Sequence, residues 1–376
     1  MEYRFLFPLG KAYGQAFCNR IEETKILVGH IQSGKHSLLI APRRYGKSSL
    51  AEKAIKQANI PHIKINFHLC TTEKEVADII LNNVIKLIGL SINQVEKLIQ
   101  SIKKYAANFE PLLSFGNDRA HLRLEPKRNI NSAVIISDAL LLLEKLLREK
   151  NRRVVIFFDE FQEISRIKNN TAIEGAIRTA AQEMNCVSII FSGSIRSLLL
   201  HMFENEARPL YKLCRKIKLK RISKEDYEKH IQRIAKKTWG EQLEPTVLNS
   251  IVRFTNRHPY YVNYLCDCIW SQQTRLPNKC DIEKAWQQVV KEEWGDAIRE
   301  LSDLAMGQRR LLRFIALGNS KNIMSRECSE QLHMSISSIN SAVTALLNKD
   351  YLEKHEHGKY EVINPLLLAV LQGAYE

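Results

Sequence analysis

Hydrophobic and polar positions predict an alternation of strands and helices over the first 222 residues. Three short apolar runs, at 37–40, 154–158 and 187–191, are typical of strands buried on both faces of a parallel sheet. Alternating positions at 62–67 and 216–222 predict two further strands. Helical periodicity covers most of the intervening segments, so the pattern favours a doubly wound α/β domain.

Two stretches of this region are less regular. Residues 73–104 give two helical patterns that are divided near Gly89. Residues 105–130 carry four breakers, Pro111, Gly116, Asn117 and Pro126. Because such residues interrupt regular structure, we expect 105–130 to be irregular. From Lys224 onward the pattern is helical, until short helices and two short strands end the chain.

The segment after the first apolar run fits a phosphate-binding loop. It ends a strand and opens a helix, where backbone N–H groups can surround phosphates at the positive end of the helix. Its members are Ala41, Pro42, Arg43, Arg44, Tyr45, Gly46, Lys47, Ser48 and Ser49. We expect these nine residues to bind the phosphates of ATP. The alternative is a basic turn that opens an ordinary helix.

Individual positions of the loop carry distinct chemistry. Gly46 lets the backbone approach a phosphate, Lys47 reaches the β and γ oxygens, and Ser48 supplies a hydroxyl oxygen to Mg²⁺. Ala41 stands where such loops usually have glycine. We expect alanine to be tolerated there, because the position needs a small residue more than it needs a positive φ.

A pair of carboxylates follows the second apolar run. Since the strand is buried, Asp159 emerges at its carboxyl end, where open α/β sheets bind their ligands. We expect Asp159 to hold Mg²⁺ through water and Glu160 to accept a proton from the water that attacks the γ-phosphate. The alternative is that both carboxylates merely cap the strand.

An adjacent Asp-Glu pair is typical of phosphate-loop ATPases with an extra strand between the loop strand and the carboxylate strand. The run 187–191 is the candidate for that extra strand. A polar side chain at its end can sense the γ-phosphate or orient the attacking water. Ser194 and Arg196 are the candidates, and a simple strand-ending turn is the alternative.

Six motifs spread over nearly the whole chain resemble the archaeal-type ATPases, a family related to the AAA+ initiators and the STAND signalling ATPases. They are Phe17–Arg20, the Pro42–Ser48 loop, Phe158–Gln162, Phe191–Ser194, Pro209–Tyr211 and His258–Tyr261. The resemblance implies a P-loop ATPase core over residues 1–222, a helical lid over 223–300 and a winged helix over 301–376.

The resemblance also implies roles for individual residues. It places Asn19 and Arg20 near the nucleotide base, and Pro259 in a lid segment that contacts the nucleotide. The usual Gly-Gly of that lid segment is replaced here by Asn256-Arg257, which makes Arg257 a candidate phosphate contact. Arg208 and Arg215 are candidates for an arginine finger, and a surface residue or an ion-pair partner is the alternative for either.

The order of elements in residues 301–376 predicts a winged helix-turn-helix. In a DNA-reading module the exposed side of its third helix would face the major groove, through Ser337, Ser338, Asn340, Ser341 and Thr344. The same fold also serves as a protein-contact module, and the segment carries no net charge, with eight cationic and eight acidic residues.

The net positive charge of the chain is concentrated in its first 220 residues. The chain has 56 Lys and Arg against 41 Asp and Glu, a net charge of +15, of which +14 lies in residues 1–220. Such an excess favours polyanionic partners. A basic run would form part of a DNA-binding surface, namely Lys212, Arg215, Lys216, Lys218, Lys220 and Arg221; the alternative is a strand edge protected by lysine.

Three functions remain open. The first is an ATPase that hydrolyses ATP with Mg²⁺ as a nucleotide-dependent switch, and the second is an ATPase that acts on DNA. The third is a STAND-type signalling or defence scaffold that forms homo-oligomers with nucleotide and binds no DNA. No run reaches the ~18 apolar residues of a membrane span, and no signal peptide is recognisable, so we expect a cytoplasmic protein without a membrane partner.

Overall fold

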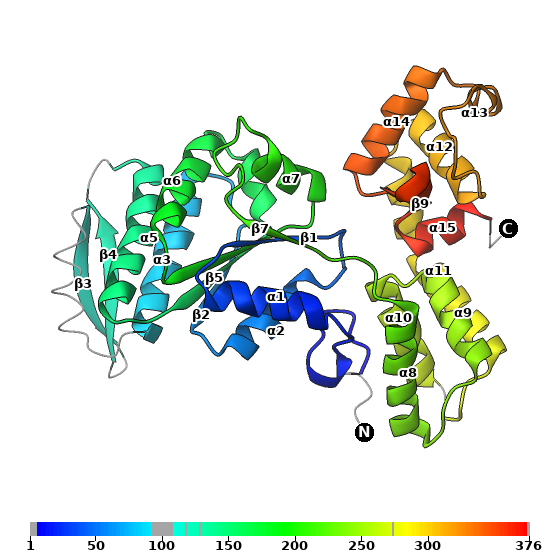
Figure 1. The fold of residues 1–376 in the computed structure, drawn as a ribbon, viewed down its shortest axis with the longest axis horizontal. Coiled ribbons are helices and arrows are strands. Elements are labelled where there is room, and N and C mark those ends of the chain that lie inside the picture. The colour runs from blue at the N-terminus through cyan, green and yellow to red at the C-terminus, as the bar shows by residue number, and fades with distance from the viewer. Residues whose placement is uncertain (1–5, 92–107, 117–118, 128–129, 273, 374–376) are drawn as a thin grey trace. The chain divides into compact units, whose positions relative to one another are not determined.

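The computed structural model describes residues 6–91, 108–116, 119–127, 130–272 and 274–373 (Figure 1). Its contacts divide the chain into two compact units. Unit 1 comprises residues 1–19, 44–46 and 220–376, and unit 2 comprises residues 20–43 and 47–219.

Unit 2 is built on a five-stranded parallel sheet. Its spatial order is β2 (His62–Asn66), β5 (Val154–Asp159), β6 (Val187–Ser192), β1 (Ser37–Ile40) and β7 (Arg215–Lys218). Every residue of β1, β5 and β6 is buried, as their mostly apolar sequences predict. The α/β class is confirmed, and β6 lies between β1 and β5, which confirms the extra strand.

Helices cover both faces of this sheet. Figure 1 shows α1 (Ile21–Gln32) and α2 (Lys47–Ala58) on one face, with α3 (Glu73–Ser91), α5 (Ser132–Glu149) and α6 (Asn170–Glu183) on the other. Helix α3 runs through Gly89 to Ser91, so the chain does not leave the helix at Gly89 itself. One glycine costs a helix only about 1 kcal/mol, which the buried face of α3 offsets. The second helical pattern lies outside the described residues.

The expectation that residues 105–130 are irregular is wrong for their described part. Strands β3 (Phe109–Gly116) and β4 (Arg119–Pro126) form an antiparallel pair. In a two-stranded ribbon both strands are edge strands, and an edge tolerates a proline that has no N–H to donate. Pro111 and Pro126 are therefore compatible with β3 and β4, although prolines normally argue against a strand.

An aromatic cluster lies below the carboxyl ends of β5 and β6. The rings of Phe158 and Phe161 stack with centroids 5.8 Å apart, and the Phe161 ring meets Phe191 edge-on at 4.7 Å. Phe67 and Phe203 extend the cluster on either side. Because Phe161 is fully buried, the short 3-10 helix η3 (Phe161–Arg166) that follows Glu160 is anchored to the sheet.

The part of unit 1 that follows residue 220 starts with four helices, α8 (Lys224–Trp239), α9 (Pro245–Thr255), α10 (Pro259–Gln272) and α11 (Lys279–Ser302). The remaining elements are α12 (Met306–Ala316), α13 (Arg326–Leu332), α14 (Ile336–Asn348), β8 (Leu352–Lys354), β9 (Tyr360–Val362) and α15 (Pro365–Leu371). Three helices followed by a two-stranded hairpin is the order that the sequence predicts. Apolar residues of both groups share one core, and the separation of a lid from a winged helix at residue 300 stays a prediction.

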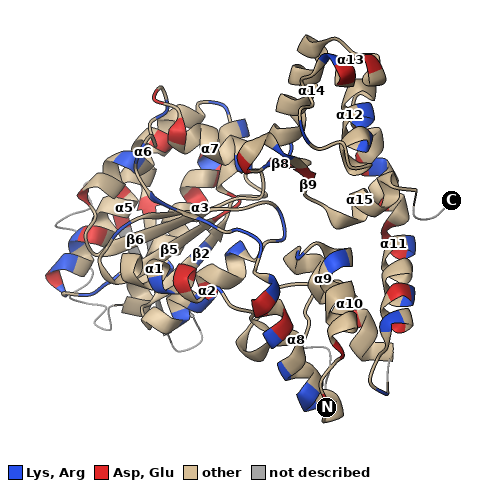
Figure 2. Cartoon of the chain, turned by 45° about the vertical axis from the view of Figure 1, so that its right-hand side comes forward, with Lys and Arg blue, Asp and Glu red and all other residues tan. Residues whose placement is uncertain are grey.

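Charged residues are distributed unevenly over the C-terminal helices. In Figure 2, α14 carries neither colour along its length, whereas α11 alternates between basic and acidic residues. Ser337, Asn340, Ser341 and Thr344 of α14 are exposed. No helix among the described residues has the length and apolar character needed to cross a membrane.

Candidate active site

The phosphate loop joins β1 to α2. Gly46 has a φ of +83°, which a residue with a side chain rarely adopts, and Lys47 is the first residue of α2. Ala41 is buried and does not have a positive φ. Alanine at this position therefore places no side chain in a strained backbone conformation, as expected for a site that needs only a small residue.

Lys47 is held over its own loop. Its Nζ donates to the carbonyl oxygens of Ala41 and Pro42, both at 2.9 Å, and the side chain is buried. These two contacts leave the ammonium group among backbone carbonyls at the start of the helix. A cation fixed at the positive end of a helix can meet a phosphate there without first being drawn out of solvent.

Asp159, at the end of β5, contacts the loop helix α2 and the neighbouring strands β2 and β6. Ser48 Oγ donates to Asp159 Oδ2 at 3.3 Å, Ser192 Oγ donates to Oδ1 at 2.5 Å, and Lys64 forms an ion pair with Oδ2. Burial alone would raise the pKa of Asp159, but the hydrogen bonds from Lys64 and Ser192 outweigh it and lower the pKa below its ordinary value. Asp159 is therefore a fully ionised, strongly held carboxylate.

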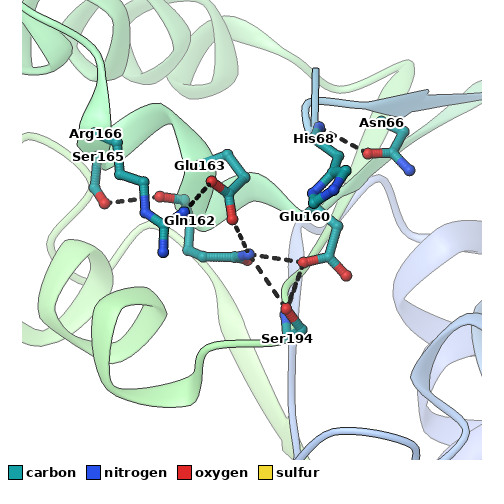
Figure 3. A network of polar contacts seen from close by, with 8 residues as sticks. All are labelled: Asn66, His68, Glu160, Gln162, Glu163, Ser165, Arg166 and Ser194. Carbon is teal, nitrogen blue, oxygen red and sulfur yellow. Dashed lines mark hydrogen bonds and ion pairs between the residues drawn. The ribbon is translucent and has the colours of Figure 1, made fainter. Parts of the chain in front are cut away.

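Glu160 is fixed by a network at the ends of β5 and β6 (Figure 3). Ser194 donates to Glu160 Oε2 from its hydroxyl at 2.7 Å and from its backbone N–H at 3.2 Å. Gln162 Nε2 donates to the same Oε2 at 2.7 Å and to Glu163 Oε1 at 3.0 Å. Glu160 itself has a φ of +52°, a left-handed conformation that turns the chain directly after the strand.

Gly193 makes room for this network. A Cβ built on Gly193 would lie 1.9 Å from Gln162 Oε1 and 3.0 Å from Gln162 Cδ. Gln162 is fully buried, so its amide has little space to move away. The Phe-Ser-Gly-Ser sequence thus combines a glycine that admits the Gln162 amide with a serine that contacts Glu160.

The sequence assigned no role in the site to Lys64, Gln162 or Ser192, although Gln162 and Ser192 lie within two of the six motifs. Lys64 lies on β2, which pairs with β5 in a register that sets Asn66 opposite Asp159. Ser192 is the last residue of β6. The pairing register of the strands brings Lys64 and Ser192 to Asp159. For Ser192 the sequence held one signal, namely a polar residue at the end of an apolar strand.

The fold recurs among solved structures, although no family model and no curated protein matches the sequence. The Walker-type ATPase of Pyrococcus abyssi superposes with a TM-score of 0.70 at 17% identity, over 98% of this chain and 99% of that one. The ORC2 protein of Aeropyrum pernix, solved in ADPNP–ADP complexes, gives 0.59 at 13% identity, over 99% and 97%. The chain has the fold of these two proteins.

Within this fold, the residues expected near the base fall in different units. Asn19 belongs to unit 1, where its side-chain amide donates to Asp226. Arg20 belongs to unit 2, has a φ of +62° and forms an ion pair with Glu23 at 2.9 Å. Their role in binding the base stays a prediction.

The three candidate arginines of unit 2 have different surroundings. Arg208 forms an ion pair with the fully buried Glu174 and donates to Asn170 Oδ1 at 2.9 Å. For Arg208 the structure therefore favours an ion-pair partner within unit 2 over an arginine finger or a surface residue. Arg215 is exposed on the edge strand β7. Arg196 is the first residue of α7 (Arg196–Glu204), and its catalytic role stays a prediction.

The tip of the phosphate loop packs within unit 1. Arg44 lies 4.0 Å from the centre of the Tyr260 ring, and the Tyr45 and His258 rings meet edge-on at 4.9 Å. Burial, with the nearby charges of Arg221 and Arg44, lowers the pKa of His258 to about 3. These contacts lie next to Pro259, whose role toward the nucleotide is untested.

Arg221 does not belong to an exposed basic surface. It forms an ion pair with Glu361 at 3.0 Å and donates to the Asn256 carbonyl at 2.7 Å, with only 7% of its side chain exposed. Asn256 also donates to Glu361 from its side chain. The expectation that Arg221 extends the basic run of the surface is therefore wrong, because a buried guanidinium must be paired where it lies.

Proposed function

We propose that this protein is an ATPase that hydrolyses ATP with Mg²⁺ and uses the reaction as a nucleotide-dependent switch. The observation that carries the proposal is the meeting of two motifs 111 residues apart, where Ser48 Oγ lies 3.3 Å from Asp159 Oδ2. Lys47 and Glu160 flank these two residues in the sequence. A phosphate-binding lysine, a metal-binding oxygen pair and a carboxylate base are the parts that phosphoryl transfer to water requires.

The residues present fit a magnesium ion. Mg²⁺ prefers hard oxygen ligands and is usually held by one or two protein oxygens together with substrate phosphates and water. The Ser48 hydroxyl and the ionised Asp159 carboxylate supply such oxygens. Within the described ranges no three His, Cys, Asp or Glu side chains come together as a self-sufficient metal site. This agrees with an ion that arrives with the nucleotide and neutralises charge on its phosphates when bound.

Glu160 is the group that would accept the proton. In the proposed reaction a water oxygen attacks the γ-phosphorus, the bond from phosphorus to the bridging oxygen breaks, and ADP leaves. The proton of the water passes to the Glu160 carboxylate, while Ser194 and Gln162 fix the orientation of Oε2. Lys47 would leave its backbone carbonyls for the β and γ oxygens, where its charge offsets the charge that develops.

The comparisons support nucleotide binding. One protein of the same fold is described as a Walker-type ATPase, and another was solved with ADPNP and ADP. Because their identities to this chain are 17% and 13%, they support the proposal through the fold alone. The nine loop residues from Ala41 to Ser49, together with Asn19, Arg20 and Pro259, are the proposed nucleotide contacts.

Two other functions remain candidates, each with its own supporting observation. Action on DNA is supported by the net charge of +14 over residues 1–220. A signalling scaffold that assembles with nucleotide is supported by the uncharged, exposed face of α14, which suits a protein partner or a second copy as well as it suits DNA. We propose that residues 301–376 form a winged helix with one of these roles.

The test is ATP hydrolysis by the full chain with Mg²⁺ and with excess EDTA, beside the Glu160→Gln variant. We expect Mg²⁺-dependent release of phosphate by the wild type. The variant should keep ATP bound and lose roughly two or more orders of magnitude in turnover. An inactive wild type that binds no nucleotide would overturn the proposal, and equal loss of binding and turnover would remove Glu160 from the role of base.

A further inference from the structure

A basic hollow lies in unit 2 at the amino ends of β1 and β7. It has a volume of about 690 Å³ and is lined by five cationic residues, Lys35, Arg178, Lys212, Arg215 and Lys216. None of the described residues that line it is Asp or Glu. The phosphate loop follows the opposite, carboxyl end of β1. The hollow is therefore separate from the proposed ATP site.

The walls of this hollow are fixed by hydrogen bonds. His36 Nε2 is 2.9 Å from the Ala181 carbonyl, and His36 Nδ1 accepts from the Ile189 N–H at 3.1 Å. The Arg215 N–H donates to the His36 carbonyl at 3.0 Å, which ties the start of β7 to β1. Arg178 donates to the Tyr211 carbonyl at 2.9 Å. The cations thus project from a frame that is formed before any ligand arrives.

Four of the cations are exposed around this frame: Lys35, Lys212, Arg215 and Lys216. Lys35 and Arg215 are close enough to act on one group, because after burial they are the main causes that lower the pKa of His30. Lys216 is partly neutralised by an ion pair with Glu204. The remaining excess of positive charge is concentrated on the rim of the hollow.

The need to protect an edge strand with lysines does not account for all the cations around the hollow. Strand β7 is at the edge of the sheet, and lysines on such a strand discourage pairing with other chains. That argument covers Lys216 and Lys218, which are exposed on β7. It does not cover Lys35, which precedes β1, or Lys212, which lies in the loop before β7. Cations from separate segments that converge on one hollow indicate a ligand.

We propose that this hollow and the adjoining edge strand bind the phosphate backbone of double-stranded DNA. The hollow alone would suit any phosphate group. The exposed cations continue beyond it along β7 to Lys218, and an extended series of charges matches a polyanion better than a single phosphate. The contacts are to backbone phosphate, so the proposal implies binding without sequence preference. It is independent of whether the protein hydrolyses ATP.

The test measures binding of the full chain to a 30-base-pair DNA duplex by fluorescence anisotropy over a series of KCl concentrations. The variant is Lys35→Glu/Lys212→Glu/Arg215→Glu. A matched control, Lys56→Glu/Lys86→Glu/Lys168→Glu, changes the net charge equally at exposed positions of unit 2 outside the hollow. Because each neutralised phosphate contributes about 0.9 to the salt slope, loss of three contacts should flatten the slope by roughly two to three.

We expect the hollow variant to bind at least tenfold more weakly than the control at low salt. The milder Lys35→Gln/Lys212→Gln/Arg215→Gln variant should show the same order of effect if charge reversal disturbs folding, which thermal melting will reveal. If the control variant weakens DNA binding as much as the hollow variant, the proposal is overturned, because net charge alone then explains the affinity. It is also overturned if the wild type does not bind the duplex, or if inorganic phosphate at equal phosphate concentration displaces the duplex completely.

Discussion

The Ser194 hydroxyl donates to Glu160 Oε2 at 2.7 Å, and this bond joins the ends of two adjacent strands, β6 and β5. Because Gln162 donates to the same oxygen, Glu160 is held from two sides. These donors fix the orientation of the carboxylate. The geometry of the proposed base therefore depends both on the neighbouring strand end, through Ser194, and on the segment that follows Glu160, through Gln162.

Removal of the Ser194 hydroxyl should affect the chemical step more than binding. We expect Ser194→Ala to lower the ATP turnover by roughly tenfold or more, since Glu160 loses one of the donors that orient it. The affinity for ATP should change little. Turnover and nucleotide affinity are to be measured beside Ser197→Ala, a hydroxyl of α7 outside the network. Equal turnover in both variants would exclude Ser194 from the site.

Gly193 and Gln162 should behave as one unit. A methyl group at Gly193 would displace the Gln162 amide, and Gln162→Ala removes the amide outright. Each variant alone should therefore lower turnover, and the double variant Gly193→Ala/Gln162→Ala should be no worse than Gln162→Ala. A double-mutant cycle in ATP turnover measures this coupling. Losses that simply add would contradict the arrangement in Figure 3.

Much of this core could be predicted because its signals are local. The buried runs predict β1, β5 and β6, and the loop and the Asp159-Glu160 pair each occupy a few consecutive residues. Lys64 and Gln162 could not be placed, since their contacts depend on strand register and on the space left by Gly193. The strands at Pro111 and Pro126 could not be predicted either, because a proline interrupts a central strand but is tolerated in an edge strand.

Lys47 should be needed for tight binding of nucleotide. Lys47→Ala removes the ammonium group that lies over the loop carbonyls, so we expect the affinity for ATP to fall by at least tenfold while the melting temperature changes little. Isothermal titration with ATP and Mg²⁺ measures the affinity, and Lys56→Ala, an exposed lysine of α2, is the control. Near-normal affinity in a folded Lys47→Ala protein would remove the phosphate-loop assignment.

The Arg208–Glu174 pair should contribute to stability. Glu174 is fully buried, and burial raises its pKa even though Arg208 pulls the pKa down. Arg208→Met leaves that carboxylate without its partner, which typically costs about 3–5 kcal/mol. A raised pKa in the folded state means that this loss is greatest at neutral pH and shrinks on acidification, when Glu174 is protonated. Melting temperatures at pH 7 and pH 5 test the sign, with Arg208→Met/Glu174→Gln as the control that removes the charge.

His230 should make unit 1 sensitive to acid. Burial, with the charge of Arg233, lowers its pKa from 6.5 to about 4, and its ring packs against Phe7 at 6.1 Å. With a lowered pKa in the folded state, its contribution to stability is present above pH 6.5. It is lost as the pH falls toward 4, because the unfolded chain takes up the proton first.

Between pH 7 and pH 5 this difference amounts to about 2 kcal/mol. His230→Phe keeps an aromatic ring beside Phe7 and removes the titrating group, so the melting temperature of the variant should fall less than that of the wild type over this interval. His357→Phe, on the exposed turn before β9, serves as the control. The assignment fails if the His230→Phe and His357→Phe variants lose the same number of degrees on acidification as the wild type.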